Sequence, residues 1–186
     1  MSAPSPPGYH LARRERIPLE RLSWISLAAA PLWLALFVAL ARALGARFRV
    51  RPRFGPRRIV RALTLLSVIM PLAHEAVHGI VARALGARPR FGLGAGFAYT
   101  TFAEPVSRDA YLAIGLAPLL ALSGTGLALL VAWPRRAGQL LIFLVGNAAG
   151  STGDLWVLAQ VAALPADALI RDLADGFAVY LPDDGA

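Results

Sequence analysis

The stretch "PLAHEAVHGI", residues 71–80, places two histidines and a glutamate inside an apolar run that extends over about residues 59–85. A run of that length can cross the roughly 30 Å of hydrocarbon in a bilayer as a helix. Ionisable side chains are costly at that depth and usually mark a functional site. His74, Glu75 and His78 are therefore the first candidate functional residues.

The composition indicates an integral membrane protein. Residues of the types AVILMFWYC make up 57% of the 186 residues, and the mean hydropathy is +0.58. All 19 basic residues are arginine, and the net charge is +8. Because the arginines cluster beside apolar runs, we expect them to contact membrane lipid headgroups and not nucleic acid. The absence of cysteine excludes disulfides and cysteine-based metal sites.

Four long apolar runs, at about residues 24–44, 59–85, 111–133 and 138–164, predict four transmembrane helices. Between the second and third runs, residues 86–109 are rich in glycine and aromatics, which predicts a short β-hairpin or re-entrant loop. The predicted fold is therefore an all-α membrane protein with about four transmembrane helices and this hairpin or loop. The expected location is a bacterial cell membrane, with several crossings.

The remaining segments lie outside the predicted helices. Residues 1–20 are expected to form a flexible N-terminal tail, residues 21–180 a single transmembrane domain, and residues 181–186 a C-terminal tail. The arginines between positions 47 and 53 predict an interfacial loop, and the acidic segment after residue 164 predicts a short surface helix.

The spacing of the HExxH motif suits metal binding when the motif lies on a helix. His74 and His78 are four residues apart, so both imidazoles leave the same face and can bind one Zn²⁺. Glu75 projects beside them and can take a proton from water at the metal. Without a metal, two histidines and a glutamate would stand unpaired in hydrocarbon at a cost of several kcal/mol. The membrane setting therefore favours the metal site.

A catalytic zinc needs a third protein ligand and an open position. Asp154 is the remaining candidate, because it is the other acidic residue deep in an apolar run and lies at a depth similar to that of the histidines. Asn147, Ser151 and Asp154 share one helical face. Asn147 could hold the substrate backbone or stabilise an oxyanion, and Ser151 could orient Asp154.

The alternative for Asn147 and Ser151 is ordinary hydrogen bonding between helices. Four glycines near the motifs are expected to allow close helix packing: Gly79, Gly146, Gly150 and Gly153.

The order of "HEAVHG" at 74–79, "LAP" at 116–118 and "NAAGSTGDL" at 147–155 resembles the DUF3267 family, whose name is "putative zincin peptidase". That family is similar in turn to the site-2 protease group of intramembrane metalloproteases. The resemblance covers about residues 60–180. It implies that His74, His78 and Asp154 hold the zinc and that Glu75 is the base. An asparagine upstream of the aspartate ligand would correspond to Asn147.

The expected function is that of a membrane-embedded zinc metallopeptidase, with Glu75 and Asn147 in catalytic roles. Its expected partners are membrane lipid and a peptide or transmembrane-protein substrate. The alternative is a non-catalytic membrane protein that binds metal or acts as a scaffold. A metal transporter ranks behind both, because the apolar runs carry few polar residues outside the two motifs.

Overall fold

The computed structural model describes residues 5–48, 55–94, 98–102, 104–173 and 175–183. Four helical stretches among these residues are long and apolar enough to cross a membrane: Leu19–Ala43, Val60–Ala84, Arg108–Ala132 and Pro134–Val161. The prediction of four membrane-length helices is confirmed. The arginine-rich loop predicted near residues 47–53 lies mostly outside the described residues, as does the end of the predicted C-terminal tail.

The four stretches are built from shorter elements. The first is α1 (Leu19–Ala43), and the second joins α2 (Pro56–Thr64), a π-helical turn (Leu65–Ile69) and α3 (Met70–Ala84). The third is α4 (Arg108–Ala132). A 3-10 turn (Pro134–Arg136) leads into α5 (Ala137–Gly150), and α6 (Thr152–Val161) follows after Ser151.

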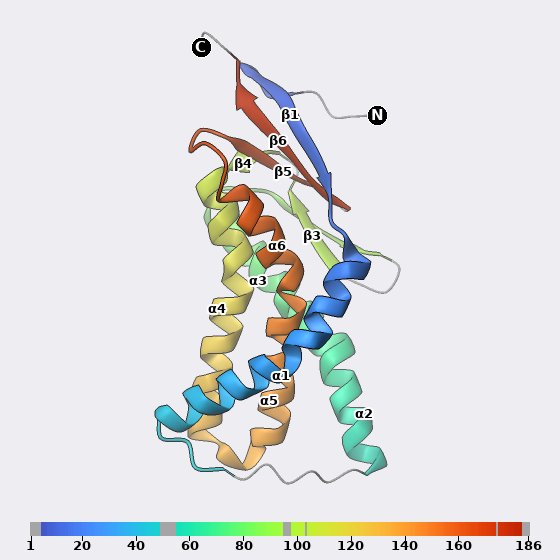
Figure 1. The fold of residues 1–186 in the computed structure, drawn as a ribbon, viewed down its shortest axis with the longest axis vertical. Coiled ribbons are helices and arrows are strands. Elements are labelled where there is room, and N and C mark those ends of the chain that lie inside the picture. Colours follow the sequence, from blue (N-terminus) through green and yellow to red (C-terminus); the bar gives the residue numbers. More distant parts are fainter. Residues whose placement is uncertain (1–4, 49–54, 95–97, 103, 174, 184–186) are drawn as a thin grey trace. The chain divides into compact units, whose positions relative to one another are not determined.

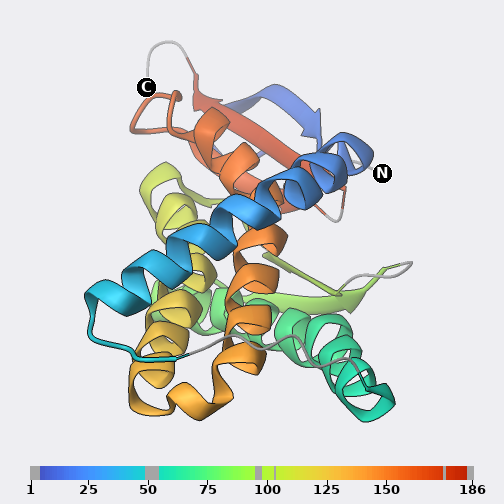
Figure 2. The ribbon, with the colours of Figure 1, turned by 60° about the horizontal axis from the view of Figure 1, so that its bottom comes forward.

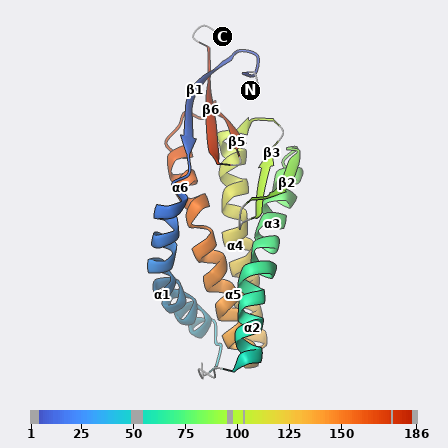
Figure 3. The same cartoon turned by 90° about the vertical axis from the view of Figure 1, so that its right-hand side faces the viewer.

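The described residues also form six strands in two sheets, so the all-α prediction is wrong in that respect. One sheet has the order β1-β6-β5-β4, with β1 (Tyr9–Arg16), β6 (Gly176–Pro182), β5 (Leu169–Leu173) and β4 (Val106–Ser107) (Figure 1). In the other, β2 (Pro89–Leu93) pairs antiparallel with β3 (Ala98–Phe102) (Figure 3). This pair is the hairpin expected between residues 86 and 109.

The segment expected to be an N-terminal tail contains β1, and the segment expected to be a surface helix contains β5 and β6. β1 pairs antiparallel with β6, from Tyr9 opposite Pro182 to Arg16 opposite Gly176. Backbone hydrogen bonds make this pairing, and they do not depend on the charged side chains of β1. Successive residues of β6 from Phe177 to Tyr180 are all buried, so both faces of this strand are covered.

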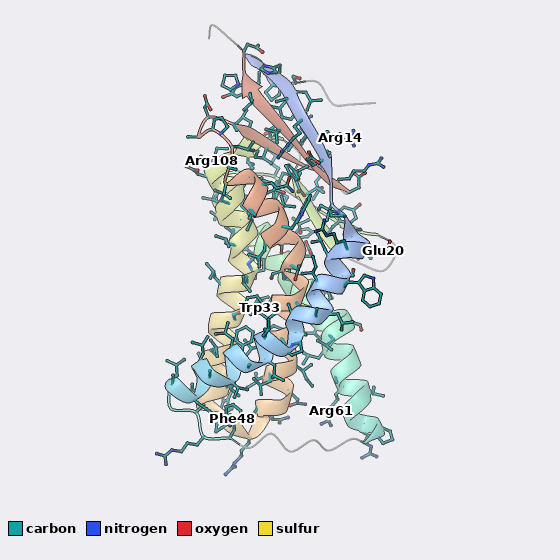
Figure 4. The ribbon with its side chains drawn as sticks, viewed as in Figure 1. Arg14, Glu20, Trp33, Phe48, Arg61 and Arg108 are labelled. Carbon is teal, nitrogen blue, oxygen red and sulfur yellow. The ribbon has the colours of Figure 1, made fainter. Side chains whose placement is uncertain are left out.

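The contacts of the chain divide it into two compact units. The first unit comprises Met1–Leu19, His78–Ala117 and Gly153–Ala186, and its core includes Ile114, Val161, Ile170 and Phe177. Arg108, labelled in Figure 4 at the start of α4, donates from Nη1 to the Leu164 carbonyl at 2.9 Å. This bond ties the start of α4 to the chain that follows α6.

The second unit comprises Glu20–Val77 and Pro118–Thr152. Its core includes Phe37, Leu130 and Leu144, and Trp33, which is labelled in Figure 4, stacks on Phe37 with ring centroids 6.0 Å apart. The 3-10 turn lets α5 return antiparallel to α4 (Figure 2).

Of the four glycines expected to allow close helix packing, Gly146 does so, because a Cβ there would meet Leu66. A Cβ on Gly150 would make only an ordinary contact, 3.8 Å from the Met70 methyl, and one on Gly79 would meet the Phe91 ring of β2. A Cβ on Gly153 would have no neighbour within 4 Å among the described residues.

Gly115 allows α4 to pack against α6, the helix that carries Asp154. A Cβ at Gly115 would lie 2.6 Å from Leu158 Cδ2 and 3.1 Å from Cγ, whereas a Cβ at Gly124 on the same helix has open space. We expect Gly115→Ala to lower the free energy of unfolding by about 1–3 kcal/mol through overpacking. Gly124→Ala should be neutral or stabilising by up to about 1 kcal/mol. Thermal unfolding in detergent compares the two variants, and equal midpoints would contradict this account of the packing.

Candidate metal centre

The HExxH motif lies on α3, where its two histidines are buried and its glutamate is half-buried. His74 and His78 are 7% and 8% exposed and lie one turn apart on the same helix face. Glu75 follows His74 on α3 and is half-buried. The two imidazoles are therefore held by regular helix geometry, as the spacing predicts.

Asp154 lies in the first turn of α6, where the helix dipole favours a negative charge. One of its carboxylate oxygens, Oδ1, lies 3.6 Å from His78 Nε2. That separation is too long for a hydrogen bond. It is close to the spacing of about 3.3 Å between two ligand atoms that surround one tetrahedral zinc at 2.0–2.1 Å.

His74, His78 and Asp154 together form a group that could hold a metal ion. Each offers one ligand atom, and the three atoms lie within 4.8 Å of one another. Two imidazole nitrogens and one carboxylate oxygen form a donor set that suits zinc. The residues present therefore fit the metal that the motif implies.

His78 is oriented by a backbone carbonyl. Its Nδ1 lies 2.9 Å from the carbonyl oxygen of Ile114 on α4, in a buried contact. A carbonyl can only accept, so Nδ1 must carry the proton and donate. The neutral ring then has its lone pair on Nε2, the nitrogen that faces Asp154.

His74 is oriented by Asn147 in the same sense. Asn147 Nδ2 lies 3.2 Å from the Pro118 carbonyl, which can only accept, so this atom is the amide nitrogen. The amide oxygen therefore faces His74 Nδ1 at 3.1 Å and accepts its proton. Both histidines thus have Nδ1 protonated and Nε2 able to bind a metal.

Asn147 makes hydrogen bonds to a neighbouring helix, and Ser151 makes one within its own helical turn. Asn147 is fully buried, and its Nδ2 also lies 3.4 Å from Ser123 Oγ. Ser151 Oγ donates to the Asn147 carbonyl at 2.9 Å. The structure thus places Ser151 against Asn147, and it places Asn147 against a candidate ligand.

The carbonyls of Ile114 and Pro118 are parts of the site that the sequence motifs do not show. Every residue has a backbone carbonyl, so residue type alone cannot mark one. The available signal is the proline itself, because a proline inside a helix removes the hydrogen bond to the carbonyl four residues earlier.

A comparison with protein families gives one match. The family model "DUF3267: Putative zincin peptidase" matches residues 67–169. The match covers more than half of the chain and includes both histidines, Glu75, Asn147 and Asp154. Searches of curated proteins and of solved structures gave no match.

We expect the purified protein to bind about one zinc ion, and Asp154→Ala to bind zinc at least about 100-fold more weakly. The reason is that loss of a ligand should cost more than the 10- to 100-fold typical of supporting residues. Competition against a chromogenic chelator measures the affinity. Asp167→Ala removes an exposed carboxylate of the same unit and is the matched control. Equal affinities for the two variants would exclude Asp154 as a ligand.

Proposed function

The chain belongs to the DUF3267 family, and from that premise we propose that it is a membrane-embedded zinc metallopeptidase similar to site-2 proteases. The observation that carries the proposal is the group His74, His78 and Asp154, whose members come from helices long and apolar enough to cross a membrane. The proposed substrates are peptide bonds of membrane or membrane-proximal proteins.

The number of ligands supports catalysis over a purely structural metal site. Structural zinc sites are almost always closed by four protein ligands, whereas catalytic sites keep three and leave one position for water or substrate. Among the described residues, the group comprises three. When bound, zinc would polarise a substrate carbonyl and make water more acidic.

Glu75 is the proposed proton carrier. It follows His74 on α3 and is half-buried, and its proposed role requires its carboxylate to reach a water at the ligand face. Glu75 would accept the proton of the attacking water and later deliver it to the leaving amine. With Nδ1 protonated, His74 and His78 each keep Nε2 as their basic nitrogen, and a bound metal would occupy that atom, which leaves Glu75 as the proposed base.

The β2–β3 pair is the proposed place for an extended substrate. A peptide bond inside a helix is shielded, so a transmembrane substrate has to unwind before cleavage. An unwound segment can add to a strand edge by backbone hydrogen bonds. β2 contributes Phe91, which packs on Gly79 next to His78, and the strongly exposed Leu93. This sheet therefore lies beside the ligand-bearing turn of α3.

Glu75→Gln should lose cleavage by about 10²–10⁴-fold while it keeps zinc, because the amide cannot accept the proton. The assay is cleavage of a fluorescent membrane-spanning peptide with a central glycine pair, with the enzyme reconstituted in lipid vesicles. Glu104→Gln, a change of an exposed glutamate, is the matched control.

Cleavage by Glu75→Gln at the wild-type rate would remove Glu75 from the proposed role. If neither form cleaves any peptide and both bind zinc equally, the non-catalytic metal-binding function becomes the better description.

A further inference from the structure

We propose that Pro118 is a positioning residue that makes one turn of α4 the anchor for both zinc-binding histidines. It acts through its missing N–H and through its carbonyl oxygen. The inference rests on the metal-binding part of the proposed function and does not depend on peptidase activity.

The first half of the proposal concerns His78. In an α-helix the N–H of each residue bonds the carbonyl four residues earlier, so the partner of the Ile114 carbonyl would be the N–H of residue 118. Proline has no N–H, which leaves this carbonyl without its helical donor. His78 Nδ1 takes that place at 2.9 Å. The bond that orients a zinc ligand thus replaces a helix bond that proline cannot make.

The second half concerns His74. The carbonyl of Pro118 accepts from Asn147 Nδ2 at 3.2 Å, and Asn147 Oδ1 accepts from His74 Nδ1 at 3.1 Å. Asn147 is therefore a relay that fixes His74 to the carbonyl of the same proline. Both Nδ2 and Oδ1 of Asn147 are therefore engaged in these hydrogen bonds.

The two carbonyls on α4 have the same spacing along the chain as the two histidines on α3. Residues 114 and 118 are four apart on α4, and the histidines are four apart on α3. These hydrogen bonds lie away from solvent, since Ile114 is 2% exposed and Pro118 and Asn147 are among the most completely buried residues. A buried carbonyl or imidazole N–H without a partner is unfavourable.

The rival explanation is that Pro118 only shapes α4 by its ring. The chain offers a control for such a change, since Pro31 also lies inside a helix, α1, but is exposed and distant in sequence from every candidate ligand. Substitution of either proline by alanine restores an N–H inside an apolar helix. Only at Pro118 would that N–H compete with a histidine.

The test is the zinc dissociation constant in detergent, measured by competition with a chelator of known affinity. We expect Pro118→Ala to bind zinc about tenfold or more weakly than wild type, because an outer partner of a ligand is lost. Pro31→Ala should stay within about twofold. The Co²⁺-substituted proteins should show the same order, with a changed visible spectrum for Pro118→Ala alone.

Replacement of Pro118 by lactic acid separates the N–H from the ring. The ester that results has no N–H and no ring, so we expect it to keep wild-type affinity within about threefold. Should it bind as weakly as Pro118→Ala, the ring is what matters and the proposal is overturned. Wild-type affinity in Pro118→Ala overturns it as well.

The relay is tested on its own if a change at Pro118 prevents folding. Asn147→Ala should weaken zinc binding about tenfold or more, whereas Ser123→Ala, which removes the longer of the two Nδ2 contacts, should stay within about threefold. Wild-type affinity in Asn147→Ala would contradict the relay. Absence of zinc binding by the wild-type protein would instead contradict the proposed function itself.

Discussion

The approach of the Asp154 carboxylate to the His78 imidazole is the contact on which the proposed metal chemistry depends. Asp154 Oδ1 on α6 lies 3.6 Å from His78 Nε2 on α3, in a chain whose long helices are apolar. A metal ion shared with His74 would bind this carboxylate and would also give the site its reactivity.

The elements around this contact hold it in place from several directions. The core of Ile114, Leu158, Val161 and Phe177 fixes α4, α6 and the β1-β6-β5-β4 sheet to one another within the first unit. Gly115 lets the Leu158 side chain sit close to α4. The imidazoles themselves are held at Nδ1 by a carbonyl and an amide oxygen. Outer partners of this kind fix the ring nitrogen that faces a metal.

The sequence predicts the helices and the candidate ligands because a membrane imposes strict rules. Long apolar runs must be helical, and ionisable residues such as His74, His78 and Asp154 stand out within them. The strands β1, β5 and β6 follow weaker rules. Half of the residues of β1 are charged, and its pairing comes from backbone bonds to a strand about 170 residues away in the chain. The carbonyls of Ile114 and Pro118 cannot be recognised from residue type, although a proline inside an apolar run indicates a helix carbonyl without its usual donor.

X-ray absorption at the zinc edge tests the central claim most directly, because it reports the atoms around the metal in the intact protein. The metal site described above predicts two imidazole ligands at about 2.0–2.1 Å and oxygen ligands at about 2.0–2.2 Å, with four or five atoms in total. His78→Ala should remove one of the imidazole signals. A shell of oxygen atoms without imidazole scattering, or a spectrum that does not change in that variant, would contradict it.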